Sequence, residues 1–186
     1  CLTFDPDLLI LLDQSEHNLF KMEKECSLTN HPVSFQTILG DVRDKTILER
    51  VFASFRLDVV FHAAAYKHVP MQENHPWEAI LTNIQGTLNL INIAEDSTVN
   101  RFVLVSTDKA VNPTNIMGAT KRIAEKLIQS KSLDSSVKYM AVRFGNVIGS
   151  SGSVIPTFQE QIKNGGPVTI TDPKMQRFFM SLSEAS

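Results

Sequence analysis

Short apolar runs alternate with longer stretches of helical period along the chain. Runs rich in Val, Ile, Leu and Phe predict strands at residues 8–12, 34–39, 59–63, 101–106, 138–144 and 168–170. Amphipathic stretches predict helices near residues 17–24, 45–55, 77–95, 116–131 and 154–164. Asp44 and the "NPTN" before Ile116 are expected to begin two of these helices, because short polar side chains accept from free N–H groups. The alternation is typical of an α/β fold with a parallel sheet covered by helices.

Composition sets limits on the partners of this chain. Of its 186 residues 42% are hydrophobic and 20% charged, which suits one globular domain. With 18 basic and 20 acidic residues the net charge is −2, so we expect no nucleic acid partner. The longest apolar run, "LLILL", is far shorter than the roughly 20 residues that cross a bilayer, so we expect no membrane contact from this chain. Cys1 and Cys26 show no metal spacing, which favours a reducing, cytoplasmic compartment and no metal site.

Polar and small residues gather where the predicted strands end. In such sheets ligands bind outside the carboxyl ends of the strands. The segments found there are Asp13, "GDVRD" (40–44), "HAAAYKHVP" (62–70), "STDK" (106–109) and "RFGNVIGSSGSVIP" (143–156). We therefore expect the functional site at this edge.

Several of these segments could contact a dinucleotide. Asp13 could accept from ribose hydroxyls and Asp41 from an adenine amino group, although each could also be an ordinary turn residue. Three alanines, 63–65, would let a flat ligand lie against the backbone, or simply allow tight packing. Lys67 and His68 could meet a phosphate or sugar, or be a solvated surface pair.

Asp108 and Lys109 pair an acid with a base at the end of a strand. Such a pair can supply one proton donor and one acceptor, each with its pKa changed by the other. The alternative is a surface ion pair of little energy. Met117 and Lys121 are four residues apart and share a helix face, where Met is usually core filler.

A Gly-rich phosphate-binding fingerprint is absent from the chain. A dinucleotide fold should open with a strand and a Gly-rich turn at a helix N-terminus, yet no G-x-G-x-x-G occurs. If Asp13 ends the second strand, the first strand lies upstream of Cys1. We therefore expect residues 1–186 to form part of an NAD-binding and catalytic domain.

Six blocks carry a family resemblance. They are "GDVRDKTILERVF", "DVVFHAAAYKHVPMQE", "NIQGTLNL", "RFVLVSTDKAVNPTNIMGATKRIAEKL", "VRFGNVIGSSGSVIPTFQEQI" and "MQRFFMSLSEA". On these blocks the chain resembles the extended short-chain dehydrogenases of polysaccharide biosynthesis, the CapD-like nucleotide-sugar 4,6-dehydratases. The resemblance implies a Rossmann-type doubly wound sheet and a UDP-N-acetylglucosamine 4,6-dehydratase with tightly held NAD. It implies that hydride leaves carbon 4, water is lost from carbons 5 and 6, and hydride returns to carbon 6. The 4-keto-6-deoxy product would serve cell-surface polysaccharide synthesis.

The same resemblance implies roles for individual residues. Asp108 would protonate the leaving hydroxyl, Lys109 would take the carbon 5 proton, and Thr107 would bind the 4-hydroxyl. Met117 stands where most short-chain dehydrogenases have Tyr, so the hydroxyl proton must leave by Asp108 or a water near Lys121. The expected cofactor-binding residues are Asp13, Asp41, Val42, Ala63, Ala64, Ala65 and Lys121, the last at the nicotinamide ribose. The expected substrate-binding residues are Lys67, His68, Arg143 and Asn146.

The resemblance also bears on the whole protein. Its strand order puts the missing first strand at the sheet centre, which predicts two half-sheets with unpaired inner edges, and most of the sugar-binding region is expected beyond Ser186. We expect little activity from residues 1–186 alone and a homo-oligomeric parent. The resemblance leaves open whether the parent is anchored at the inner membrane with its catalytic domain on the cytoplasmic side. Two alternatives are a non-catalytic remnant that binds nucleotide or a partner, and an NAD-dependent nucleotide-sugar epimerase.

Overall fold

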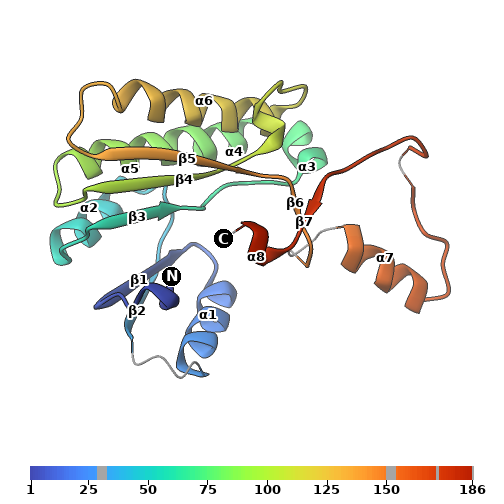
Figure 1. The fold of residues 1–186 in the computed structure, drawn as a ribbon, viewed down its shortest axis with the longest axis horizontal. Helices are drawn as coiled ribbons and strands as arrows, with labels where there is room; N and C mark the ends of the chain where they lie inside the picture. Colours follow the sequence, from blue (N-terminus) through green and yellow to red (C-terminus); the bar gives the residue numbers. More distant parts are fainter. Residues whose placement is uncertain (29–32, 150–153, 171, 186) are drawn as a thin grey trace.

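The computed structural model describes residues 1–28, 33–149, 154–170 and 172–185 of an α/β fold (Figure 1). The strands are β1 (Leu8–Asp13), β2 (Ser34–Leu39), β3 (Val59–His62), β4 (Arg101–Thr107), β5 (Lys138–Phe144), β6 (Asn146–Val147) and β7 (Phe179–Met180). The α-helices are α1 (Glu16–Leu28), α2 (Lys45–Ser54), α3 (Val69–Asn74), α4 (Pro76–Ala79), α5 (Gly86–Glu95), α6 (Ile116–Lys131), α7 (Val154–Lys163) and α8 (Leu182–Ala185). Short helical turns are η1 (Leu2–Phe4), the π-helical η2 (Ile80–Gln85) and η3 (Asp108–Ala110).

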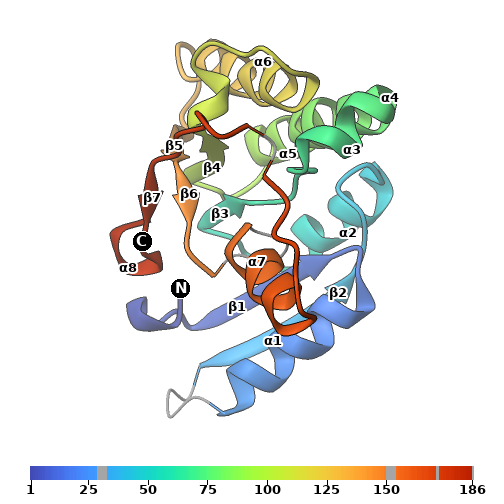
Figure 2. The ribbon, with the colours of Figure 1, turned by 90° about the vertical axis from the view of Figure 1, so that its right-hand side faces the viewer.

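The main strands form two separate parallel half-sheets. One contains β1 and β2, the other has the order β3-β4-β5, and a small third pair joins β6 to β7. Among the described residues no strand lies between β1 and β3, and the two half-sheets are distinct in both ribbon views (Figures 1 and 2). The prediction of a Rossmann-type sheet divided into two halves is thus confirmed.

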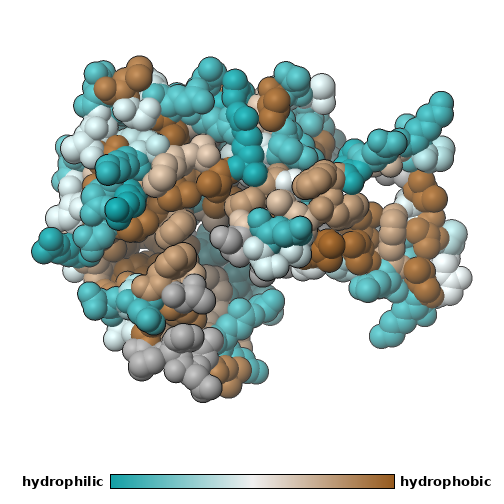
Figure 3. Space-filling model, viewed as in Figure 1, coloured by the Kyte–Doolittle hydropathy of each residue, from teal (hydrophilic) through white to brown (hydrophobic). Residues whose placement is uncertain are grey.

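The hydrophobic core lies between the larger half-sheet and its helices. Side chains of β4 alternate, so that Phe102 and Leu104 are fully buried while their neighbours are less so. They pack with Ile91 of α5 and Ala124 of α6 in one cluster, which fixes both helices over the sheet. The sheet's other face remains open: Phe61 is 56% exposed, and Figure 3 shows apolar surface over β3–β5.

Two predicted helix starts are confirmed by their capping bonds. The Asp44 side chain accepts from the N–H groups of Thr46 (2.9 Å) and Ile47 (3.2 Å) at the start of α2. Asn115 Oδ1 accepts from the Gly118 N–H (2.8 Å) at the start of α6. The second cap places the first turn of α6 directly beside the end of β4.

Some predicted elements were wrong. Residues 168–170 form no strand; Ile170 is 67% exposed, and no partner strand adjoins it among the described residues. The single helix predicted at 77–95 is instead α4, the π-helical η2 and α5 in succession. Helix α3 was missed, as was the β6–β7 pair. Residues 150–153 of the small-residue segment lie outside the described residues. None of the described helices is long and apolar enough to span a bilayer.

Candidate active site

Three predicted catalytic residues are joined by hydrogen bonds at the end of β4. Thr107 Oγ1 donates to Asp108 Oδ1 (2.9 Å), and Lys109 Nζ donates to the same oxygen (3.0 Å). Burial raises the pKa of Asp108, but the bonds from Lys109 and Thr107 outweigh it, so the net pKa lies below its ordinary value. In this arrangement Asp108 is a carboxylate at neutral pH.

Asn146 comes from a different strand and joins this group. Its Oδ1 accepts from Lys109 Nζ at 3.4 Å. Because β6 follows β5 directly, the carboxyl ends of β4 and β5 bring the acid, the base and the amide to one place. The carboxylate of Asp108 is 46% exposed and the amine of Lys109 is 29% exposed, so both can be reached from solvent.

Lys121 lies on the buried face of α6, as the helical spacing predicted. Its Nζ donates to the carbonyl oxygen of Val105 (2.6 Å), which ties the helix to β4. Burial lowers the pKa of Lys121 to about 8, with a smaller opposing effect from Glu125. Met117 is buried one turn earlier on the same face, with only 4% of its surface exposed. The structure thus places both residues beside the Thr107–Lys109 segment.

A buried carboxylate, Glu125, was missed by sequence reasoning. Its Oε1 accepts from Ser106 Oγ (2.6 Å) and Arg143 Nε (2.8 Å), and its Oε2 accepts from Arg143 Nη2 (2.7 Å) and Arg122 Nη1 (3.0 Å). The bonds from Arg143 lower the pKa of Glu125 to about 2 against the effect of burial. Arg143, predicted to bind substrate, therefore directs two of its donors at Glu125. Glu125 follows Lys121 by four residues, and this helical spacing could have predicted that Glu125 lies on the same buried face of α6.

The loop after β3 is held in an extended path by Asn83. Asn83 Oδ1 accepts from the Tyr66 N–H (2.9 Å), while its Nδ2 donates to the Tyr66 carbonyl (3.2 Å) and to Thr120 Oγ1 (3.0 Å). This residue belongs to the π-helical η2, a conformation often found at functional sites. Ala63 and Ala64 of the supported loop are exposed, and Ala65 is half-buried.

A buried histidine supports the start of the same loop. His62 Nε2 lies 2.8 Å from Thr87 Oγ1, and Thr87 donates its own hydroxyl proton to the Asn83 carbonyl (2.7 Å). Since the threonine proton is used there, His62 must donate from Nε2. Burial lowers the pKa of His62 to about 3, so the ring is neutral.

Lys67 and His68 line a cavity of about 430 Å³. The remaining lining residues are Tyr66, Met71, Gln72, His75 and Glu78. The cavity adjoins the loop after β3, whereas Thr107 ends β4 and is followed by Asp108 and Lys109. The two groups of predicted residues are therefore on neighbouring segments of the same edge.

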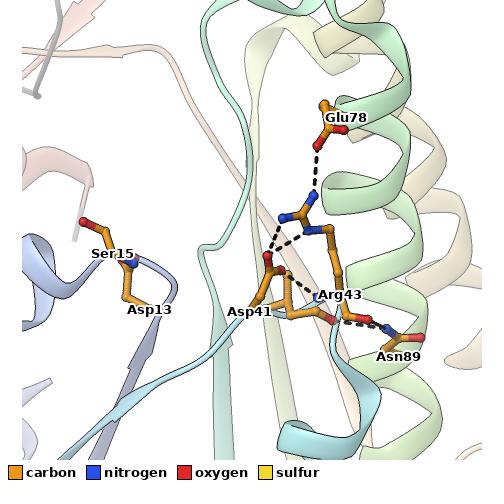
Figure 4. A network of polar contacts seen from close by, with 7 residues as sticks. Asp13, Ser15, Asp41, Arg43, Glu78 and Asn89 are labelled. Atoms are coloured by element: carbon orange, nitrogen blue, oxygen red, sulfur yellow. Dashed lines mark hydrogen bonds and ion pairs between the residues drawn. The ribbon is translucent and has the colours of Figure 1, made fainter.

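Two acidic residues lie at the carboxyl ends of the strands in the smaller half-sheet. Asp13 accepts from the Ser15 N–H (2.7 Å) and from Asn18 Nδ2 (3.4 Å). Asp41 is bound by Arg43, as Figure 4 shows, with the Arg43 N–H at 2.9 Å from Oδ1 and Nε at 2.8 Å from Oδ2. Burial raises the pKa of Asp41, but its bonds and charge interaction with Arg43 lower it more.

Val42 turns its side chain into the core. It is 6% exposed, and its carbonyl accepts from Asn89 Nδ2 (3.1 Å). Gly86 of α5 lies so close that an added Cβ would be 2.6 Å from Val42 Cγ2. The "GDVRD" loop is thus packed against α5. Among the described residues no cluster of His, Cys, Asp and Glu could hold a metal ion.

The parallel half-sheets with helices packed on them have the architecture of a Rossmann-type fold. The polysaccharide biosynthesis protein family matches residues 1–186, the whole chain. The chain belongs to this family, as the resemblance predicted.

Relatives by sequence include dehydratases and epimerases. The chain is 51% identical over 185 residues to the capsular polysaccharide biosynthesis protein CapD of Staphylococcus aureus, covering 98% of this chain and 31% of that protein. It is 40% identical over 186 residues to a UDP-N-acetylglucosamine 4,6-dehydratase (inverting) of Campylobacter jejuni, covering 97% and 54%. It is also 40% identical over 185 residues to a UDP-glucose 4-epimerase of Rickettsia canadensis, covering 95% and 53%. The chain thus spans a third to about half the length of these relatives.

Solved structures agree with the fold. Pen from Bacillus thuringiensis superimposes with a TM-score of 0.88 at 42% identity, covering 97% of this chain and 55% of that one. DesIV, a dTDP-glucose 4,6-dehydratase from Streptomyces venezuelae solved with NAD bound, has a TM-score of 0.82 at 22% identity, covering 96% and 60%. The second likeness shows the fold alone.

Proposed function

We propose that the protein to which this chain belongs is a nucleotide-sugar 4,6-dehydratase that acts on UDP-N-acetylglucosamine. The observation that carries the proposal is the hydrogen-bonded group of Thr107, Asp108 and Lys109 at the end of β4. It supplies a hydroxyl, a carboxylate and an amine on successive residues, as an elimination requires. The dehydratase from Campylobacter jejuni at 40% identity supports this substrate.

The residues at the strand ends fit an adenine dinucleotide, NAD. Asp41 is a charged acceptor at the end of β2, and Ala63 and Ala64 expose a flat surface after β3. Lys121 presents an amine beside β4, where it would hold the nicotinamide ribose. When bound, NAD would accept hydride from carbon 4 of the sugar and return it to carbon 6.

The hydrogen bond from Thr107 to Asp108 suggests the path for the 4-hydroxyl proton. Met117 has no acidic proton and is buried, so it takes no part in proton transfer. Asp108 begins as a carboxylate, because its pKa is lowered, and can take the sugar 4-hydroxyl proton through Thr107. The protonated Asp108 then donates to the carbon 6 hydroxyl, which leaves as water. The acid returns to its starting state, so the protons balance.

Lys109 would take the carbon 5 proton and return it after water has left. Lys109 acts as a base only in its neutral form, and transfer of the 4-hydroxyl proton to Asp108 neutralises the carboxylate that its Nζ contacts. Asn146, which accepts from Lys109 Nζ, would hold the amine toward the sugar.

Lys67 and His68, which line the neighbouring cavity, are proposed to contact the substrate, and Arg143 acts through Glu125. The cytoplasmic location and the homo-oligomer remain predictions.

The reaction is tested with the full-length protein. Incubation with UDP-N-acetylglucosamine should yield a 4-keto product lighter by one water, detected by mass spectrometry. Asp108→Asn should abolish it, whereas Asp134→Asn, at an exposed turn after α6, should not. Turnover retained in Asp108→Asn would refute the assigned role.

An epimerase is the second candidate, because a UDP-glucose 4-epimerase shares 40% identity with the chain. It would return hydride to the opposite face of carbon 4 and leave the product mass unchanged. The Asp108–Lys109 pair favours elimination, since epimerisation needs no acid for a leaving hydroxyl. Absence of any product, with nucleotide still bound, would instead favour the non-catalytic alternative.

A further inference from the structure

Arg43 makes contacts that hold the Asp41 carboxylate in one orientation. Its guanidinium approaches Asp41 Oδ2 through Nε (2.8 Å) and Nη2 (2.6 Å), while its backbone N–H donates to Oδ1 (2.9 Å). The hydrogen bond from Nε and the ion pair from Nη2 hold Oδ2, and the backbone N–H holds Oδ1, so both the position and the rotation of the carboxylate are fixed. Figure 4 shows these contacts converging on Asp41.

The Arg43 side chain is itself held from the other side. Its Nη1 donates to Glu78 Oε2 (2.8 Å), which comes from α4. Asn89 Nδ2 donates to the carbonyl of Arg43 (3.2 Å), which binds the loop to α5. The side chains of Arg43 and Glu78 are 34% and 47% exposed, so this chain of contacts lies at the surface of the site.

The Asp41 carboxylate has an acceptor position that no described residue uses. A carboxylate has about four lone-pair positions. The Arg43 guanidinium covers Oδ2 with a hydrogen bond and an ion pair, the Arg43 N–H takes one position on Oδ1, and the structure gives the Asp41 side chain no other partner among the described residues. One acceptor position therefore remains, on Oδ1, and its direction is set by Arg43.

We infer that Arg43, anchored by Glu78, is a positioning residue that aims the open Oδ1 acceptor of Asp41 at the 6-amino group of a bound adenine. The inference rests on the proposed NAD site. It adds that base recognition depends on a residue with no contact of its own to the base. Adenine presents a donor at position 6, whereas hypoxanthine presents a carbonyl acceptor that would face the carboxylate. The site should thus prefer adenine, and the preference should depend on Arg43.

The test compares two ligands on the full-length protein after removal of bound nucleotide. Dissociation constants are measured by calorimetry for NAD and for the dinucleotide in which hypoxanthine replaces adenine. Arg43→Met should reduce the preference for NAD about tenfold, the effect of losing one well-placed bond to a charged group. Lys45→Met is the matched control, because Lys45 is a nearby exposed cation whose ion pair is with Glu49 rather than with Asp41. The control should leave the preference unchanged.

A double-mutant cycle shows whether Arg43 acts through Asp41. Asp41→Ala should lose the preference, and adding Arg43→Met to it should cause no further change in the ratio. Glu78→Gln should give a smaller loss, because only the outer anchor is weakened. If Arg43→Met is too unstable to titrate, Arg43→Lys tests the same point, since Lys keeps the charge without the planar fork.

The outcomes separate the inference from the proposed function. An equal loss of affinity for both ligands in Arg43→Met would make Arg43 merely structural and overturn the inference, as would an unchanged preference. Failure of the unmutated protein to bind either dinucleotide would overturn the NAD site itself.

Discussion

The proton content of Asp108 determines how the proposed elimination runs. A general acid must carry a proton when the leaving group departs, yet this carboxylate has a lowered pKa and accepts from Thr107 Oγ1 and Lys109 Nζ. The acid is therefore loaded during the reaction, by the substrate's own 4-hydroxyl, rather than from solvent. This assigns the threonine a place in the proton path, which the buried Met117 cannot occupy.

Replacement of Thr107 tests that path. Thr107→Val removes the hydroxyl at nearly constant volume and should lower kcat roughly a hundredfold, the lower range for general acid–base catalysis. Thr107→Ser retains the hydroxyl and should keep most of the activity. Steady-state formation of the 4-keto product measures both. A Val variant as active as the Ser variant would exclude the relay.

Glu125 should make stability depend on pH. Its folded pKa of about 2 lies below the ordinary 4.5, so its contribution is present above pH 4.5 and is lost as pH falls toward 2. Glu125→Gln should cost about 2 kcal/mol at pH 7, because Arg143 and Arg122 lose a buried counter-charge. Urea unfolding at pH 7 and pH 3 measures the difference, which should shrink at the lower pH. A constant difference would show that the ionised form is unimportant.

At the scale of the elements, helix α6 packs against η3 and β4 and so fixes the position of the site residues. Its cap at Asn115 brings the first turn against η3, and Lys121 ties it to β4 two turns later. Gly118 permits this approach: a Cβ there would lie 2.5 Å from the Lys109 carbonyl oxygen. The helix and the Asp108–Lys109 segment therefore cannot move independently.

Two glycine substitutions should separate the catalytic and cofactor regions. Gly118→Ala must displace backbone that carries Lys109, so kcat should fall at least tenfold while the affinity for NAD changes little. Gly86→Ala would instead press on Val42 and should weaken NAD binding. Kinetics and calorimetry on both variants give the comparison. The reverse pattern would contradict the division of roles.

The sequence correctly predicted those helices and strands that are set by neighbouring residues, such as helix caps and apolar runs. Asp44 and Asn115 cap the helices they were expected to begin, and the apolar runs at 101–106 and 138–144 lie within paired strands. The strand predicted at residues 168–170 was wrong, because a short apolar run becomes a strand only beside a partner strand. The clustering of Thr107, Asp108 and Lys109 followed from adjacency, whereas the bonds of Glu125 with Ser106 and Arg143, and of Arg43 with Glu78, join distant segments. No local pattern could reveal those.

At the scale of the whole molecule, the expected cofactor-binding residues are divided between the half-sheets. Asp13 ends β1 and Asp41 follows β2, whereas Ala63 and Lys121 belong to the β3-β4-β5 unit. Among the described residues no backbone pairing joins the two units. A ligand that bridges them would stabilise their relative placement as well as occupy the site.

Residues 1–186 expressed alone should self-associate and show little dehydratase activity. The inner edges of β1 and β3 have unpaired N–H and C=O groups among the described residues, and Phe61 is exposed beside one of them. Sedimentation velocity should show oligomers that grow with concentration. A stable, active monomer would contradict this expectation.

The division between β1 and β3 has a practical consequence for protein engineering. A parallel strand inserted there would find hydrogen-bonding partners on both of its edges, which few open sheets offer. The chain is thus suited to fragment complementation, in which a separate polypeptide supplies that strand and assembly is read out by the recovery of nucleotide binding.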